Sequence, residues 1–208
     1  MENETALETS RRRMIILSAV AVFLYWVAMY IYAPTLPTYV RSKTSDLALV
    51  GVVLSMYGLW QAIIRVPLGI ASDWLGKRKP FILAGFVLTG LGAYMMAVAP
   101  NVNGLMLGRA ITGLAAGTWV PLVVLFSSLF PARDAVRASA LLTMVGSVAR
   151  MIATALTGTL NQIGGYALAF YLSAGAAGLA LLVFLPTKEL TRPPQAPSLA
   201  GLARLAIR

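Results

Sequence analysis

The chain has 208 residues, of which 59% are hydrophobic and 12% charged, with a mean hydropathy of +0.79 and a formal net charge of +10. A soluble domain has about 45–50% apolar and about 25% charged residues, so this composition argues against a soluble enzyme and against a disordered segment. The absence of cysteine argues against a disulfide-stabilised secreted domain, which leaves a polytopic membrane protein.

Six apolar runs follow one another along the chain, and each is long enough to cross a bilayer as a helix. They cover residues 14–36, 47–71, 80–99, 105–130, 139–160 and 167–185, with short connections between them. We therefore expect an all-α membrane protein with six transmembrane helices at residues 14–185. Residues 1–13 form the predicted cytoplasmic tail before this bundle, and residues 186–208 form a predicted cytoplasmic Pro-rich linker with a short amphipathic segment.

The positive charges lie mostly on one side of this predicted bundle. Of the 17 Lys and Arg, 12 fall before the first run, in the second and fourth connections or after the sixth run. Arg41 and Lys43 fall in the first connection, and three more lie inside runs. This positive-inside distribution predicts a multi-pass protein of the cell (inner or plasma) membrane with both termini in the cytoplasm. It also accounts for the net charge without a nucleic-acid partner.

The connection between the second and third runs carries the most specific motif, which reads GIASDWLGKRKP over residues 69–80. Gly69 is expected to let another helix come close, and Gly76 to permit a tight turn. Asp73 is the only acid beside a group of cations. These cations are Lys77, Arg78 and Lys79. A turn with positive-inside charges is the simpler interpretation, but it explains the cations and not the Gly-Asp-Gly spacing.

This segment resembles the loop signature of the major facilitator superfamily, in which a Gly is followed by an Asp, a second Gly and then cations at these spacings. The resemblance implies a gating motif at the cytoplasmic contact between the two halves of a transporter. The implied gating residues are Gly69, Asp73, Gly76, Lys77, Arg78 and Lys79. Trp74 stands where the family often has a cation. A second segment, LGRAITGLAAG at residues 107–117, resembles the family's fourth-helix motif through Arg109 and Gly113.

The resemblance spans residues 14–185 and implies the N-terminal six-helix half of that fold, built as two three-helix inverted repeats. Such transporters work by alternating access, in which two six-helix bundles rock around a site near the membrane midplane. A second bundle would therefore come from a C-terminal half or from a homodimer. The fifth run lacks the Gly-Pro pair that drug/proton antiporters of the family often carry, which disfavours drug export.

Three arginines lie within the runs, where an uncompensated charge is costly. Arg150 lies about 12 residues into the fifth run, which at about 1.5 Å per residue is near the midplane. We expect it to face a substrate cavity, and a structural bond to backbone carbonyls or to a neighbouring helix is the alternative. Arg109 lies nearer the outer surface, and Arg65 near the inner surface, where its side chain can reach the interface. An arginine at the midplane favours an anionic or amphipathic small-molecule substrate.

Other polar and aromatic residues in the runs are candidates for the same cavity. Beside Arg150 the candidates are Gln61, Trp119 and Tyr30, of which Gln61 and Trp119 are the preferred pair. Packing or a place at the membrane interface is the simpler interpretation for each of them. We expect Gln61 to be a buried amide that needs a partner, and Trp119 lies near Pro121, which frees a backbone carbonyl. Further aromatic and amide residues of the runs are Tyr25, Trp26, Tyr57 and Asn161.

The chain has no His, and its seven acids lie outside the runs or at their edges. A proton-driven carrier generally needs a titratable group in the membrane, so either a partner half supplies it or transport is not proton-coupled. Nothing in the sequence resembles a metal cluster, a catalytic triad or a phosphate loop, so no enzyme activity, metal or cofactor is predicted. We expect transport of a small solute by a protein embedded in membrane lipid. The alternatives are a truncated or regulatory membrane subunit without transport activity, and a channel-like homo-oligomer.

Overall fold

The structure is a computed structural model that describes residues 2–189, with side chains described for residues 8–189. All regular elements in this part of the chain are helical. They are α1 (Glu2–Tyr30), η1 (Ala33–Thr35), α2 (Leu36–Arg41), α3 (Leu47–Leu75), α4 (Lys79–Ala97), α5 (Val102–Ala116), α6 (Trp119–Ser127), η2 (Ala132–Asp134) and α7 (Ala135–Phe184). Five helical stretches are long and apolar enough to cross a membrane. The predicted amphipathic segment and most of the predicted linker lie outside the described residues.

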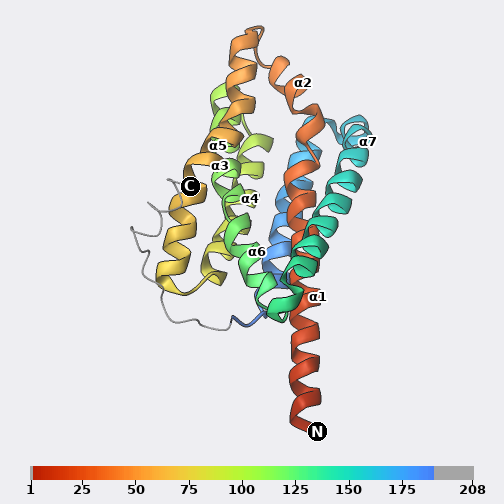
Figure 1. Cartoon of the computed structure of the whole chain (residues 1–208). Helices are drawn as coiled ribbons and strands as arrows, with labels where there is room; N and C mark the ends of the chain where they lie inside the picture. Colours follow the sequence, from red (N-terminus) through yellow and green to blue (C-terminus); the bar gives the residue numbers. More distant parts are fainter. Residues whose placement is uncertain (1, 190–208) are drawn as a thin grey trace.

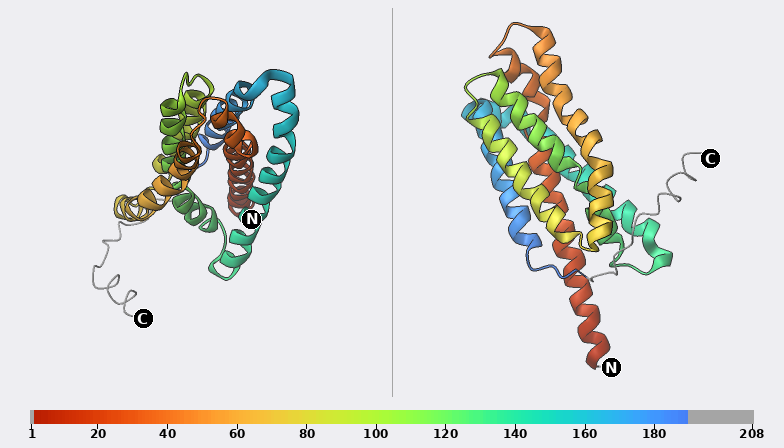
Figure 2. Two further views of the ribbon diagram at one scale, coloured as in Figure 1. Left: turned by 90° about the horizontal axis from the view of Figure 1, so that it is seen from above. Right: turned by 90° about the vertical axis from the view of Figure 1, so that its left-hand side faces the viewer.

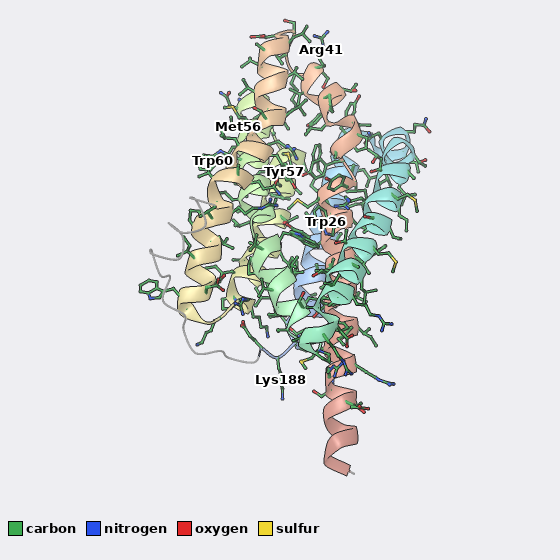
Figure 3. All side chains as sticks on the ribbon, viewed as in Figure 1. Trp26, Arg41, Met56, Tyr57, Trp60 and Lys188 are labelled. Carbon is green, nitrogen blue, oxygen red and sulfur yellow. The ribbon has the colours of Figure 1, made fainter. Side chains whose placement is uncertain are left out.

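The helices lie side by side in an elongated bundle (Figure 1, Figure 2). α1 packs along α7, α4 packs on both α5 and α7, and α3 packs on α5. A hydrogen bond from the Ser173 hydroxyl to the Ala28 carbonyl (2.5 Å) also joins α7 to α1. Figure 3 shows Arg41 at one end of the bundle and Lys188 toward the other, so two cations that the charge pattern assigns to opposite sides of the membrane lie toward opposite ends.

Two clusters of buried side chains form the core. The first, around Tyr25, Phe86 and Phe126, joins α1, α4, α6 and α7. The second, around Tyr32 and Phe170, joins the turn after α1 to α3, α5 and the part of α7 near its bend. Aromatic rings fill much of both clusters and contact one another across the helices, which fixes the spacing of α1, α4 and α7.

The fourth apolar run forms two helices instead of the single helix that the sequence predicts. The break between α5 and α6 falls at residues 117 and 118. Pro121 has no N–H for the Gly117 carbonyl, and its ring would clash with that carbonyl in a continuous helix. The nearby Ala115 carbonyl accepts hydrogen bonds from the hydroxyls of Thr118 (2.7 Å) and Tyr25 (3.2 Å). Backbone polarity exposed by the break is therefore satisfied inside the bundle.

The predicted connection at residues 161–166 is largely helical. α7 continues through it, and the backbone leaves helical geometry only at Gly164 and Gly165, where Gly165 has φ +65°. Glycine adopts this left-handed region without the steric cost that other residues bear. The chain turns back at this point, so α7 consists of two arms that run in opposite directions (Figure 1). We call them the first arm (135–163) and the second arm (166–184).

α3 is the least enclosed of the long helices. Of its 29 residues only Val50, Val53 and Ser72 are buried. Its exposed large side chains are almost all apolar, and they include Leu47, Leu49, Val52, Leu59, Trp60, Ile63, Val66, Ile70, Trp74 and Leu75. Such a surface is unfavourable in water but suits contact with lipid or with another apolar helix.

Candidate functional site

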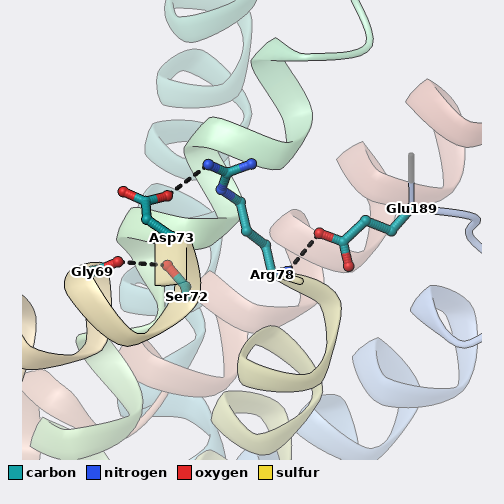
Figure 4. Close-up of polar contacts among 5 residues, drawn as sticks. All are labelled: Gly69, Ser72, Asp73, Arg78 and Glu189. Carbon is teal, nitrogen blue, oxygen red and sulfur yellow. Dashed lines mark hydrogen bonds and ion pairs between the residues drawn. The ribbon is translucent and has the colours of Figure 1, made fainter. Parts of the chain in front are cut away.

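The Gly-Asp-Gly motif lies at the turn between α3 and α4 (Figure 4). Asp73 stands in the last turn of α3, and not in the loop where the sequence places it, because the helix continues to Leu75. Its carboxylate accepts a hydrogen bond at 2.6 Å from the Arg78 guanidinium, which forms an ion pair across the turn. Gly76 follows the helix with φ +62°, the left-handed turn conformation that favours glycine.

Two other residues of the motif have fewer contacts than the sequence suggests. The expectation that Gly69 allows a close helix approach is wrong. A Cβ at this position would meet nothing nearer than a side-chain atom of Val120 at 4.0 Å, so there is room for alanine. The Gly69 carbonyl accepts a hydrogen bond from Ser72 within the same helix (2.9 Å). Lys77 is exposed and has no hydrogen bond or ion pair among the described residues.

Glu189, from beyond α7, adds to this motif. Its carboxylate accepts hydrogen bonds from the backbone N–H groups of Arg78 (2.5 Å) and Lys79 (2.9 Å). The Lys79 ammonium in turn donates to the carbonyls of Leu185 and Thr187, each at 2.6 Å. The sequence reasoning missed Glu189, because 110 residues separate it from Lys79. The available signal is an acid placed directly after the last apolar run.

Three of the four candidate cavity residues converge around one indole ring. The Arg150 guanidinium lies over the Trp26 ring at 4.5 Å and faces the Tyr30 ring at 5.7 Å. Trp119 packs edge-on against Trp26 at 5.1 Å. Gly146 makes room for this arrangement, because a Cβ there would lie 2.8 Å from the Trp26 ring. We call Trp26, Tyr30, Trp119 and Arg150 the Trp26 cluster; Trp26 lies near mid-height of the bundle (Figure 3).

The charge of Arg150 has no acidic partner in the described part of the chain. The ion pairs found there lie at the α3–α4 turn and just before α7. The Arg150 side chain makes one hydrogen bond, from Nη2 to the Ser147 hydroxyl on the same helix (3.0 Å). Stacking on aromatic faces supplies about 0.5–2 kcal/mol, which offsets only part of the cost of a cation in a membrane. The cluster therefore suits a ligand that has a negative charge and a flat apolar group.

Arg109 has a similar setting on α5. Its guanidinium lies over the Tyr57 ring at 4.6 Å and donates to the Tyr32 hydroxyl at 3.4 Å, while its Nε is buried without a hydrogen-bond partner. Gly113, one turn further along, lets α5 touch the backbone of α3, because a Cβ there would lie 2.6 Å from the Tyr57 carbonyl oxygen. The two residues of the fourth-helix motif thus differ in their contacts: Arg109 contacts two tyrosines through its guanidinium, whereas Gly113 leaves room for α3.

The fourth candidate, Gln61, is not joined to the Trp26 cluster by a hydrogen bond. Its side chain is half-buried on α3 and makes no hydrogen bond among the described residues, so the expectation of a buried amide with a partner is wrong. The physical reason is the position of α3 at the edge of the bundle, where few residues are enclosed. The described part of the chain also has no group of three or more His, Cys, Asp or Glu side chains that could hold a metal ion.

Comparison with known sequences gives a consistent set of matches. The family model described as Major Facilitator Superfamily matches residues 18–207. The inner membrane transport protein YajR of Escherichia coli is 28% identical over 162 residues, which are 76% of this chain and 35% of YajR. The quinolone resistance protein NorA of Staphylococcus aureus is 26% identical over 185 residues, which are 88% of this chain and 46% of NorA. The chain therefore spans less than half the length of these relatives.

Solved structures share the fold. A crystal structure of a mutant of the peptide transporter POT in complex with sulfate has a TM-score of 0.78 at 18% identity, covering 93% of this chain and 42% of that one. The human organic anion transporter MFSD10 has a TM-score of 0.75 at 18% identity, covering 90% of this chain and 50% of that one. At these identities the likeness concerns the helical membrane fold alone.

Proposed function

Because the chain belongs to the major facilitator superfamily, we propose that it forms one six-helix half of a transporter that moves a small solute by alternating access. The six spans of this proposal are α1, α3, α4, α5 together with α6, and the two arms of α7. They form two three-helix inverted repeats. The bend at Gly164 and Gly165 supports this count, because it makes two antiparallel arms from the longest apolar stretch.

A second six-helix bundle completes the transporter in this proposal. The relatives supply one line of support, since this chain matches only 35% of YajR and 46% of NorA. The exposed apolar surface supplies another. Besides α3, the first arm of α7 exposes the large apolar side chains Val136, Met144, Val148, Met151, Ile152 and Leu156. A C-terminal half or a second copy of this chain would cover part of this surface, and lipid would cover the rest.

The Trp26 cluster is the proposed substrate site, and Arg150 is the observation that carries the assignment. A half-buried guanidinium on an indole ring, without a carboxylate beside it, is costly in the membrane unless another group supplies negative charge. An anionic or amphipathic substrate supplies that charge, and the rings of Trp26, Tyr30 and Trp119 supply a flat apolar surface. MFSD10, an organic anion transporter with the same fold, supports including organic anions among the candidates.

We also propose that the protein lies in the cell inner or plasma membrane with both termini in the cytoplasm. The charge distribution supports this orientation. The α3–α4 turn would then face the cytoplasm as the gating motif, consistent with its place toward the same end of the bundle as Lys188 (Figure 1, Figure 3).

The first test is a ligand screen on the purified 208-residue chain, run in parallel on the wild type and on the Arg150→Met variant. Methionine keeps an apolar stem of similar length but removes the charge. Aromatic carboxylates, aliphatic carboxylates and neutral aromatic compounds are compared by their effect on thermal unfolding in detergent. Aromatic carboxylates should stabilise the wild type most, and that stabilisation should be lost in Arg150→Met. The matched control is Arg65→Met, which removes an exposed arginine of α3. Aromatic carboxylates should stabilise this variant as much as they stabilise the wild type.

A second measurement separates transport from binding alone. Ligands found in the screen are tested for uptake into proteoliposomes that contain this chain, alone and with the C-terminal six-helix half of a relative. Uptake in either preparation, lost with Arg150→Met, supports the transporter. Binding without uptake in both preparations favours the alternative of a regulatory membrane subunit. Equal stabilisation of the wild type and Arg150→Met by every compound would contradict the assignment of Arg150 to the substrate site.

A further inference from the structure

The hydrogen bonds at the end of α7 form a reciprocal connection between two helices that are distant in sequence. Glu189 accepts from the first backbone N–H groups of α4, and Lys79, the first residue of α4, donates to the carbonyls of Leu185 and Thr187 just after α7. Each helix end therefore receives the charge that its dipole favours: a carboxylate at the N-terminus and an ammonium at the C-terminus. We call these four hydrogen bonds the α4–α7 clasp.

The clasp accounts for two of the three backbone donors that α4 leaves unpaired at its start. The first N–H groups of a helix have no partner within the helix. At α4 these belong to Arg78, Lys79 and Phe81, since Pro80 has none. The residue at the N-cap position, Arg78, has no side chain that can accept, and it makes no capping hydrogen bond. The Glu189 carboxylate accepts hydrogen bonds from the first two of these donors, so it caps α4 as a Ser, Thr, Asp or Asn side chain caps other helices.

Arg78 connects this clasp to the gating motif. Its backbone N–H is bound by Glu189, and its guanidinium is bound by Asp73 at the end of α3 (Figure 4). The Arg78 side chain is only 14% exposed, so it is held between these two contacts with little freedom. Three helix ends thus meet at one residue: α3 through Asp73, α4 through its own backbone, and α7 through Glu189.

We propose that Glu189 is a positioning residue for the α3–α4 motif: it fixes the backbone of Arg78 so that the guanidinium reaches Asp73. Glu189 follows α7 and is the last residue that the structure describes, and the sequence continues for 19 more residues. A displacement of the chain at this point therefore acts directly on Arg78 and on its ion pair. This inference rests on the proposed function for its role in transport, but its structural content concerns Glu189, Arg78 and Asp73 alone.

The absence of cysteine from the chain allows single-cysteine reporters at both ends of the connection. Thr187→Cys reports on the clasp, because Thr187 is 3% exposed beside Lys79. Ser72→Cys reports on α3, because Ser72 is 2% exposed next to Asp73 and has no hydrogen bond to Glu189. Each reporter is reacted with a water-soluble maleimide in the purified 208-residue chain, and the labelling rate is measured.

Glu189→Gln should raise the labelling rate at Thr187→Cys about tenfold, the effect expected for loss of a typical helix cap. Gln keeps the size of the side chain but replaces one of the two carboxylate oxygens by an NH₂ group, which cannot accept the hydrogen bond from Arg78 or Lys79. Lys188→Gln changes a neighbouring exposed charge and should leave the rate unchanged. Ala138→Cys, a buried position near the start of α7, reports general loosening and should stay unreactive in the Glu189→Gln background. Unchanged labelling at Thr187→Cys, or an equal increase at Ala138→Cys, would overturn the clasp.

The Ser72→Cys reporter separates a positioning role from simple capping. If Glu189 positions Arg78, Glu189→Gln should speed labelling at Ser72→Cys as much as Asp73→Asn does, and the double variant should label no faster than Asp73→Asn alone. If Glu189 only caps α4, labelling at Ser72→Cys should not respond to Glu189→Gln, and the positioning role fails. These rates need no substrate, so a failed ligand screen leaves them interpretable, and a failed clasp leaves the Arg150 assignment standing.

Discussion

Replacing Gly113 by alanine should force α3 away from α5 and destabilise the bundle. A Cβ at Gly113 would lie 2.6 Å from the Tyr57 carbonyl oxygen and 3.0 Å from the Tyr57 Cα. Ordinary contact begins at 3.4 Å, so α3 has to move by about 0.8 Å (3.4 minus 2.6). The obstructing atoms belong to the backbone and cannot rotate away as the end of a flexible side chain can. Overpacking of this kind costs about 1–3 kcal/mol.

Gly58 is the matched control, because it lies on α3 beside Tyr57 and a Cβ there would meet nothing within 4 Å. Both substitutions gain a similar helix propensity, about 0.8–1.0 kcal/mol, so the difference between the two variants isolates the steric cost. Gly113→Ala should therefore be less stable than Gly58→Ala by about 1–3 kcal/mol. The assay is reversible unfolding in mixed micelles with increasing SDS, followed by tryptophan fluorescence. Equal stabilities, or a less stable Gly58→Ala, would refute the packing role of Gly113.

Three further predictions use the same preparations. Ser173→Ala should lower the free energy of unfolding by about 0.5–1.7 kcal/mol, because it removes the hydrogen bond from α7 to α1; an unchanged value would mean that this bond contributes nothing. Asp73→Asn should lower it by up to about 1 kcal/mol, whereas Asp134→Asn should have no measurable effect, because its ion pair is long (3.9 Å) and exposed. Ser45→Cys should react with an impermeant maleimide added to intact cells, while Lys77→Cys should react only after permeabilisation; the opposite pattern would reverse the proposed orientation.

The sequence predicts a chain of long apolar helices, and the described residues contain five helical stretches of that kind where six runs were expected. Length and apolarity locate the helices, because backbone groups in hydrocarbon must pair within their own segment. Breaks within a span depend on local backbone chemistry that hydropathy does not record. Pro121 marks a helix weakness, yet the break falls at its steric target, four residues earlier. The bend at Gly164 and Gly165 needs a positive φ, which composition alone does not reveal.

Some residues of the candidate site could likewise be predicted from the sequence, and others could not. Arg150 and its aromatic neighbours were accessible to sequence reasoning, because a charge deep in an apolar run is costly enough to need an explanation. The role of Trp26 as the ring on which Arg150 stacks was not, since it depends on the space left by Gly146 on α7. Glu189 was out of reach for another reason. Its partners are backbone N–H groups, which every residue except proline has, so no pairing of side-chain types could point to it.

The break between α5 and α6 divides the fourth span into two helical segments. Tilting one half of a continuous helix against the other would break backbone hydrogen bonds that hydrocarbon cannot replace. At this break the Ala115 carbonyl is held by the side chains of Tyr25 and Thr118, one of them from a neighbouring helix. The Thr118 N–H also donates to this carbonyl (3.0 Å), so the interruption leaves it fully paired. In the proposed transporter the fourth span can therefore cross the membrane as two helices without leaving this carbonyl unpaired in the hydrocarbon.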